Sequence, residues 1–314
     1  MALDVTALND FNNEVAGELV VKSVYGGSTM EYITIQEGVK HQEPINLMEV
    51  DLYIQNAACS TDFSGSLAFT QRNITVCPRT SQDGICLKTM DKKYLGISAL
   101  EPGSYNETFA LAGAYSDLLV NKFQKANDQF LWQQVSGSDS SFGGTCEASG
   151  LLRILSSGSA ADAALTAFPA NIVGTTTASL DNLETMLEAL PADVADREDL
   201  TFFMSVGKFR EFISSIRSAN NFYFDPVSIT NRGGLLEIGM PFQPNVKVVG
   251  TTGINTSRIV LGPAKQIVAG TDLMSDFSEF QLWYDINTDQ LRHRISTKLG
   301  VNVAYPEFWV SNNA

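Results

Sequence analysis

The sequence predicts an α+β fold, in which strands occur at both ends of the chain and long helices lie between them. Three observations favour this class. Alternating apolar and polar residues near 49–79 and 278–306 are typical of strands. A long amphipathic pattern at 104–136 predicts a helix. A short, fully apolar strand at 199–204 lies between two helical patterns, an order that indicates one layered unit.

The composition limits the classes of function. The chain has 314 residues, of which 44% are hydrophobic, enough for one elaborate domain or two ordinary ones. Its net charge of -14 excludes a broad basic surface of the kind that grips nucleic acid. No apolar run is long enough to cross a bilayer, so we expect no membrane partner. The N-terminus is polar and acidic, which is not typical of a secretion signal.

Residues 49–79 predict a long hairpin with a turn-forming segment between its strands. Val50, Leu52 and Ile54 alternate with polar residues, as do the apolar residues of 67–76. Two strands with one weakly apolar face are marginal in isolation. The hairpin therefore either joins a sheet of this chain or lies against a neighbouring chain, and its polarity favours the neighbour. The candidate contact residues are Asp51, Tyr53, Gln55, Asp62, Phe63, Gln71 and Arg72.

Residues 104–136 predict the longest helix. Ser104 and Glu107 match a capping box, and Gly137 ends the pattern. The apolar stripe comprises Phe109, Ala112, Tyr115, Leu119, Phe123, Ala126 and Phe130. At 1.5 Å per residue the helix would be a rod of roughly 45–50 Å. One narrow stripe on so long a helix indicates a strut that lies across a sheet.

The second half of the chain alternates helices with short strands. Helices are predicted at 180–190 and 205–217, on either side of the apolar strand. Strands follow at 246–249, 259–261 and 266–269, each bounded by glycine.

The closing stretch 278–306 predicts a hairpin turning at Asn287–Gln290. This register places Asp285 opposite Arg292, Trp283 opposite Arg294 and Glu279 opposite Lys298. Each of these pairs is complementary, by opposite charge or by a guanidinium against an aromatic ring. The cations of this strand could contact phosphates, but pairing within the hairpin is favoured because it cancels their charges.

The sequence contains few residues or motifs that are typical of a catalytic or binding site. It has two histidines, of which His293 is assigned to the apolar face of the closing hairpin, and no recognisable nucleotide, zinc-protease or calcium motif. Asp272 and Asp276 could pair on a turn as an acidic site. Free thiols are the default for the four cysteines, with a Cys59/Cys77/Cys86 metal cluster or a Cys77–Cys86 disulfide as alternatives. We expect no catalytic residue, no cofactor and no metal.

Two stretches carry a resemblance to a known family. The strand 199–205 is followed by a helix containing Lys208-Phe209-Arg210, and the chain ends with an acidic strand, an arginine-rich strand and the run 301–310, VNVAYPEFWV. With the order of elements, these resemble the major capsid proteins of tailed bacteriophages, the Hong Kong 97-type fold shared with encapsulin shells. Within that family the fit is with phages of Bacteroidetes-type hosts.

The resemblance implies a division of the chain. Residues 1–45 would form an N-terminal arm and 46–80 the extended-loop hairpin. Residues 81–225 would form the spine helix and peripheral domain, with part of the axial domain at 140–178. Residues 226–270 would complete the axial domain, and 271–314 would return to the peripheral sheet. The hairpin tip at 58–66 lacks the lysine that some members cross-link.

The resemblance also implies a function: a shell of hexamers and pentamers around double-stranded DNA, located in the virion and assembled in the host cytoplasm. The partners would be other copies of the chain, portal and other head proteins, and packaged DNA held by weak, non-specific contact. Two alternatives stay open: an encapsulin-like compartment shell, and a soluble α+β enzyme or binding protein with its acidic site at Asp272 and Asp276.

Overall fold

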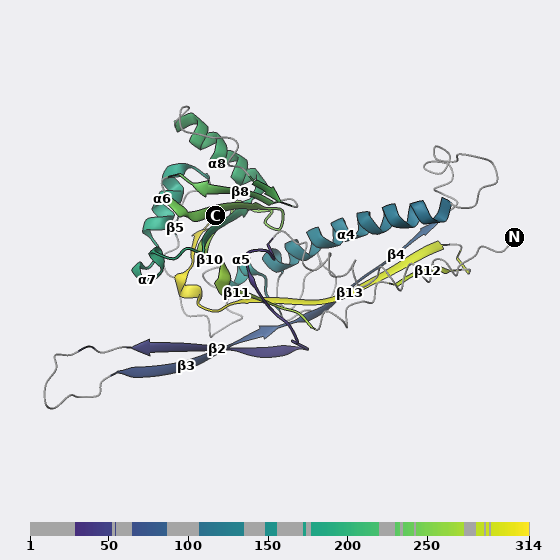
Figure 1. Cartoon of the computed structure of the whole chain (residues 1–314), viewed down its shortest axis with the longest axis horizontal. Helices are drawn as coiled ribbons and strands as arrows, with labels where there is room; N and C mark the ends of the chain where they lie inside the picture. The colour runs from purple at the N-terminus through teal and green to yellow at the C-terminus, as the bar shows by residue number, and fades with distance from the viewer. Residues whose placement is uncertain are drawn as a thin grey trace.

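The computed structural model places two layered units around the end of one long helix, with a two-stranded hairpin projecting to one side (Figure 1). It describes residues 29–51, 54, 65–86, 107–134, 148–155, 172–173, 177–219, 230–232, 235–241, 243–272, 281–285, 287–288 and 290–313. Ser104, Glu279, Asp276 and Cys59, all named above, lie outside these residues.

The described helices and strands have the following bounds. The helices are α4 (Glu107–Gln133), α5 (Leu151–Ile154), α6 (Leu180–Glu188), α7 (Ala192–Ala195) and α8 (Val206–Ala219), with short 3-10 helices η3 (Ala264–Gln266) and η4 (Pro306–Phe308). The first strands are β1 (Thr34–Gln36), β2 (Gln42–Asp51), β3 (Ser66–Thr75), β4 (Cys77–Cys86), β5 (Ile172–Val173), β6 (Leu200–Ser205) and β7 (Thr230–Arg232). The remaining strands are β8 (Leu235–Met240), β9 (Gln243–Thr251), β10 (Ile259–Pro263), β11 (Ile267–Gly270), β12 (Gln281–Asp285), β13 (Gln290–Val303) and β14 (Val310–Asn313).

The first unit is a seven-stranded sheet in the order β5-β14-β10-β6-β9-β8-β7. Its central strand β6 is the apolar strand predicted from the sequence, and it is buried because both faces are covered. Phe202 and Met204 pack with α6 and α8 on one face, whereas Phe203 points to the other face, toward the end of α4. The period of two in a strand sends neighbouring side chains into the two different cores.

The long helix α4 confirms the predicted strut. Phe123 and Phe130 of the predicted stripe are buried, and the last turn also buries Leu131 and Trp132 completely. The Trp132 ring lies 5.1 Å from that of Phe203, so the helix end packs directly on the seven-stranded sheet. The side chains of residues 107–117 are not among those described.

A buried carboxylate joins three parts of the chain at this helix end. Asp128, which is 1% exposed, accepts hydrogen bonds from the Thr29 amide at 3.0 Å and the Thr251 hydroxyl at 2.9 Å. The Trp132 indole donates to the Thr29 hydroxyl at 2.8 Å. The start of the described chain, the spine helix and the end of β9 are therefore held at one point, because a buried carboxylate is costly unless its oxygens are bonded.

The second unit is a five-stranded sheet built on β13. This strand of 14 residues pairs with β12 and β11 in succession along one edge and with β4 along the other. β1 extends the sheet in parallel with β11. Arg79 of β4 lies 4.2 Å above the Phe130 ring and donates to Asn127, which ties this sheet to α4. Burial lowers the pKa of Arg79 to about 10.

Strand β4 was not predicted. Its sequence, CPRTSQDGIC, has no alternating pattern, yet ten of its residues pair with β13. Its pairing is a tertiary contact that local periodicity does not encode. Cys77 and Cys86 stand at its two ends, about 30 Å apart in an extended chain, which excludes a disulfide between them. Cys77 is nevertheless disulfide-bonded, so the free-thiol expectation is wrong for this residue.

The closing hairpin forms, but its predicted register is wrong by two residues. Trp283 lies opposite Arg292 rather than Arg294, and Asp285 lies opposite Gln290. The reason is the turn: the Asp285 carboxylate accepts from the Thr288 hydroxyl at 2.9 Å and the Asn287 amide at 3.0 Å. These hydrogen bonds lower the pKa of Asp285. They close the turn between Asp285 and Gln290, one residue earlier than the predicted turn at Asn287–Gln290, and this moves the cross-strand register by two residues.

A two-residue shift keeps every side chain on its predicted face, since the period of a strand is two. Asp285 and Arg292 consequently still form an ion pair, on the diagonal, at 3.2 Å. Arg294 instead lies opposite Gln281, and His293 lies opposite Leu282 rather than Tyr284. Lys298 pairs with Asp272 at 2.5 Å, whereas its predicted partner Glu279 lies outside the described residues.

The predicted division into peripheral and axial parts stays a prediction, and the strand pairing links segments from both predicted parts. β6, expected in the peripheral part, is hydrogen-bonded to both β9 and β10, which were expected in the axial part. β11, placed at the end of the axial part, pairs with β13 instead. β14, expected in the peripheral sheet, pairs with β10 of the seven-stranded sheet. The chain thus crosses repeatedly between the two units.

Replacing Gly262 by alanine should destabilise the seven-stranded sheet. A Cβ at this position would overlap the ring of Trp309, which is fully buried, and overpacking a core costs about 1–3 kcal/mol. Urea unfolding of the unassembled chain measures the loss. As a control, Gly207→Ala on α8 has only Ser205 Oγ nearby and should stabilise the chain by about 0.5–1 kcal/mol. Equal effects of the two substitutions would contradict this packing.

Candidate assembly surfaces

The β2–β3 hairpin is largely exposed along strand β3. Its ten residue pairs run from Gln42–Thr75 at the base to Asp51–Ser66, and together they form a separate two-stranded sheet. The hairpin projects from the body on the side opposite to the N-terminal end of α4 (Figure 1). A two-stranded ribbon has too little apolar surface of its own to be stable alone.

One face of the hairpin is apolar and open to solvent. Met48 lies opposite Phe69 and Val50 lies opposite Leu67, so these four side chains share a face. Their exposed fractions are 57%, 70%, 59% and 55%, respectively. We call these four residues the hairpin patch. Contiguous exposed apolar side chains of this kind mark a surface that binds another molecule.

The base of the hairpin is held firmly to the five-stranded sheet. Ile74 and Val76 are buried with Val39 in a small core of their own. Backbone hydrogen bonds join Val76 to His41 and Val39 to Thr271. The ion pair of Lys298 with Asp272 lies beside the same joint, since the Thr271 hydroxyl donates to the Lys298 carbonyl. The hairpin therefore leaves the body in a defined direction.

The predicted contact residues of the hairpin are only partly described. Tyr53, Gln55, Asp62 and Phe63 lie outside the described residues. Asp51 stands opposite Ser66 at the end of the ladder. Gln71 donates to Asn46 across the strands at 2.9 Å, and Arg72 lies opposite Ile45. The role of these residues in contacts between chains stays a prediction.

Met48 was not among the candidate contact residues, and the hairpin was predicted to have only one weakly apolar face. Alternation alone shows that Val50, Leu67 and Phe69 point to one side of each strand. Only the register shows that the two apolar rows lie on the same face. A sequence search for opposed apolar rows, given the correct register, would find this patch.

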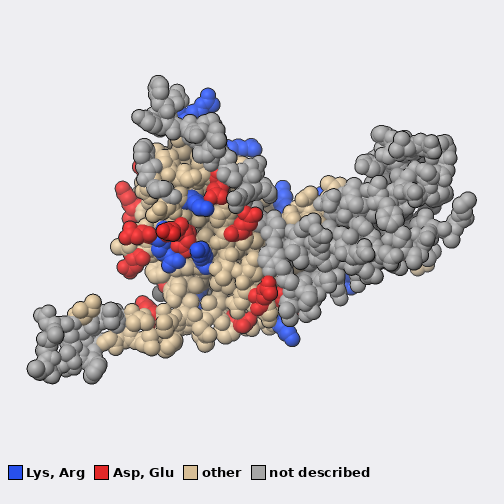
Figure 2. Space-filling model, in the orientation of Figure 1, with Lys and Arg blue, Asp and Glu red and all other residues tan. Residues whose placement is uncertain are grey.

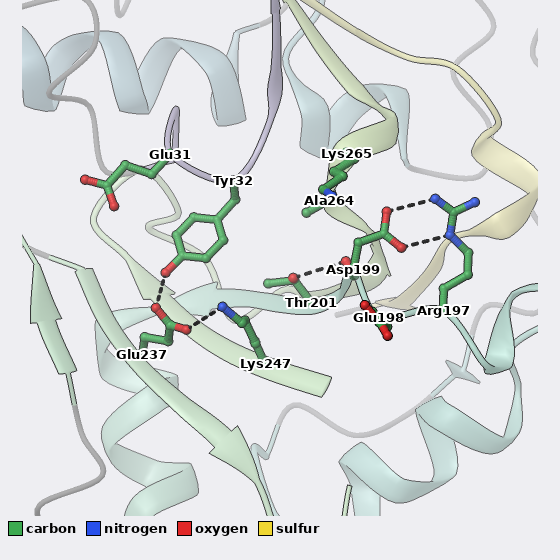
Figure 3. Close-up of a pocket in the computed structure, with 10 residues that line it drawn as sticks. All are labelled: Glu31, Tyr32, Arg197, Glu198, Asp199, Thr201, Glu237, Lys247, Ala264 and Lys265. Atoms are coloured by element: carbon green, nitrogen blue, oxygen red, sulfur yellow. Dashed lines mark hydrogen bonds and ion pairs between the residues drawn. The ribbon is translucent and has the colours of Figure 1, made fainter. Parts of the chain in front are cut away.

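A charged pocket of about 660 Å³ lies where residues 31–32 meet the seven-stranded sheet (Figure 3). The Tyr32 hydroxyl donates to Glu237 at 2.5 Å, and Lys247 pairs with the other oxygen of Glu237 at 3.0 Å. Across the pocket, Arg197 binds Asp199 through two hydrogen bonds, which lower the pKa of Asp199. The charges within each of these two ion pairs compensate one another. We therefore interpret the pocket as a structural contact between elements of the fold.

The residues considered for chemistry are spread apart. His293 is buried in β13, whereas His41 is exposed at the hairpin base. Asp272, one half of the alternative acidic site, is bound to Lys298. Within the described part of the chain, no three His, Cys, Asp or Glu side chains gather in a way that could hold a metal ion. None of the described helices is long and apolar enough to span a bilayer.

Comparisons with known proteins agree on the fold. Neither family models nor curated protein sequences match this chain. The capsid in a procapsid of satellite phage P4 aligns over 95% of this chain and 90% of its own, with 14% identity and a TM-score of 0.57. The capsid of a native GTA particle covers 92% and 91%, with 11% identity and a TM-score of 0.54. The capsid of Myoviridae phage XM1 covers 93% and 90%, with 14% identity and a TM-score of 0.52.

These similarities establish the Hong Kong 97-type capsid fold for this chain and confirm the predicted α+β class. They extend over nearly the whole chain, so both layered units and the long helix belong to the fold. At identities this low they carry the architecture alone.

The buried histidine makes the stability of the fold depend on pH. Burial lowers the pKa of His293, and the opposing carboxylate of Asp83 offsets only part of this shift. His293 is therefore neutral in the folded chain, and its contribution to stability is present above the ordinary value of 6.5. That contribution falls progressively as the pH drops below this value, because the unfolded chain binds the proton more readily.

We expect His293→Gln to remove the contribution of His293 to the pH dependence of the free energy of unfolding. The measurement is the free energy of unfolding in urea from pH 7 to pH 5, compared with wild type. His41→Gln, at an exposed histidine, is the control and should keep the wild-type slope. A wild-type slope in His293→Gln would show that this histidine does not titrate with folding.

Proposed function

We propose that this chain is the major capsid protein of a tailed phage, which self-assembles as hexamers and pentamers into an icosahedral shell around double-stranded DNA. The observation that carries the proposal is the hairpin patch on a Hong Kong 97-type body. A projecting ribbon with four exposed apolar side chains needs a covering surface, and a repeated shell provides one in each neighbouring copy.

The mechanism is association rather than catalysis. Each copy would place its hairpin over a neighbour while its rigid base stays in its own five-stranded sheet. Each contact is modest, but a shell repeats it in every copy, so stability is collective. The acidic chain, with a net charge of -14, would hold packaged DNA only by weak, non-specific contact.

The proposal includes further partners and a location. The shell would contain portal and other head proteins beside copies of this chain. It would belong to the virion and be assembled in the host cytoplasm. The seven-stranded unit would lie near the axis of each capsomer, and the five-stranded sheet with α4 would lie toward its periphery.

Substituting Phe69 by asparagine should weaken assembly. Burial of a phenylalanine contributes about 1.5–3 kcal/mol per contact, so the concentration needed for assembly should rise roughly ten- to a hundredfold. Light scattering against protein concentration measures this threshold.

The matched control is Ala68→Asn, which introduces the same residue at the next position on the opposite, also exposed, face of β3. It should assemble at the wild-type concentration. If the two substitutions shift the threshold equally, the hairpin patch is not the contact surface.

Electron microscopy of purified particles tests the proposed class of shell. We expect closed icosahedral particles, with DNA and tails when the particles come from infected cells. Particles filled with protein cargo and lacking DNA would indicate a compartment shell instead. A chain that stays monomeric in light scattering at raised concentration would contradict any shell function.

A further inference from the structure

The outer edge of the seven-stranded unit carries a run of uncompensated negative charge. Between residues 180 and 199 the single cation is Arg197, and both of its hydrogen bonds go to Asp199. The exposed carboxylates of this segment are Asp181, Glu184, Glu188, Asp193, Asp196 and Glu198. None of them has an ion-pair partner among the described residues. We call these six residues the acidic edge, and Figure 2 shows acidic side chains gathered along the side where α6 and α7 lie.

The helix α8 of the same unit has the opposite charge. Phe209, Phe212 and Ile216 are buried against the sheet, which turns the other side of the helix to solvent. Arg210 and Arg217 are exposed on that side, seven residues apart. The remaining charges of α8, those of Lys208 and Glu211, pair with each other at 2.6 Å. We call Arg210 and Arg217 the arginine face.

The two surfaces do not neutralise each other within one chain. The first residue of α6 contacts α8, since the Leu180 amide donates to Ser215. Even so, no ion pair among the described residues joins the acidic edge to Arg210 or Arg217. The surfaces lie on different sides of the unit, with α8 at its top and α6 and α7 along its left side in Figure 1.

The spacing of the charges matches. Asp181 and Glu188 on α6 are separated by seven residues, as are Arg210 and Arg217 on α8. Seven residues are two helical turns, or roughly 10.5 Å, so both arginines can face both carboxylates when the helices lie side by side. Two complementary patches at different places on one chain make a head-to-tail contact, which forms a closed ring when the rotation between copies closes.

We propose that the arginine face of one copy binds the acidic edge of the next copy around a capsomer. This inference rests on the proposed shell function and names the surfaces that join its subunits. Such exposed charges act mainly on the rate and direction of association, and salt screens them. They would reject a copy presented the wrong way round, because like charges would then meet.

The test is an exchange of charges. Two variants reverse one surface each: Arg210→Glu with Arg217→Glu, and Asp181→Lys with Glu188→Lys. Each should raise the assembly threshold at low salt at least tenfold, since like charges then face each other. The chain carrying all four substitutions restores opposite charges and should assemble near the wild-type threshold. Thermal unfolding verifies that each variant is folded.

A control variant changes the net charge equally elsewhere. Lys122→Glu with Lys125→Glu lies on an exposed part of α4 and should keep the wild-type threshold. Mixing the two single-surface variants should yield rings with an even number of copies, because acidic and basic copies must alternate. A ring of five copies would leave one like-charge contact, so native mass spectrometry of the mixture should show no pentamers.

The outcomes separate this inference from the proposed function. If wild type assembles and both single-surface variants assemble equally well, the shell function stands and the charged contact is overturned. The charged contact is also overturned if the folded four-substitution chain does not return to the wild-type assembly threshold. An equal rise of the threshold in the α4 control overturns it as well. If wild type forms no assembly at all, the shell function itself fails.

Discussion

The carboxylate of Asp128 holds the parts of this chain in place. It lies fully buried at the end of α4 and takes hydrogen bonds from the Thr29 amide and the Thr251 hydroxyl. A buried carboxyl group is costly unless its oxygens are hydrogen-bonded. The start of the described chain, the long helix and the seven-stranded sheet thus share one relative position, and the Trp132–Phe203 contact fills the space beside it.

The hairpin depends on a second, apolar joint. Its base is buried around Ile74, whereas its far part carries side chains that are more than half exposed. Within the described part of the chain, folding therefore leaves this apolar surface exposed.

Several elements could be read from the sequence because their patterns are local. The stripe through Phe123 and Phe130 predicts α4, and the apolar run at 200–204 predicts the buried strand β6. The β4 strand escaped prediction because its ten residues have no period and owe their form to pairing with β13. The register of β12 with β13 was missed by two residues, since Asp285 closes the turn through Thr288, a contact that weighs more than the cross-strand charges.

The candidate assembly surfaces also depend partly on the local sequence and partly on the tertiary structure. The amino-acid sequence alone specifies the α+β class, the long helix and the faces of the strands, because these follow from the periods of a helix and a strand. The tertiary structure alone shows that Met48 and Phe69 meet on one open face, and that Lys298 pairs with Asp272. The closing stretch keeps its predicted faces but changes its partners, since a two-residue shift preserves alternation while the geometry of the turn selects the register.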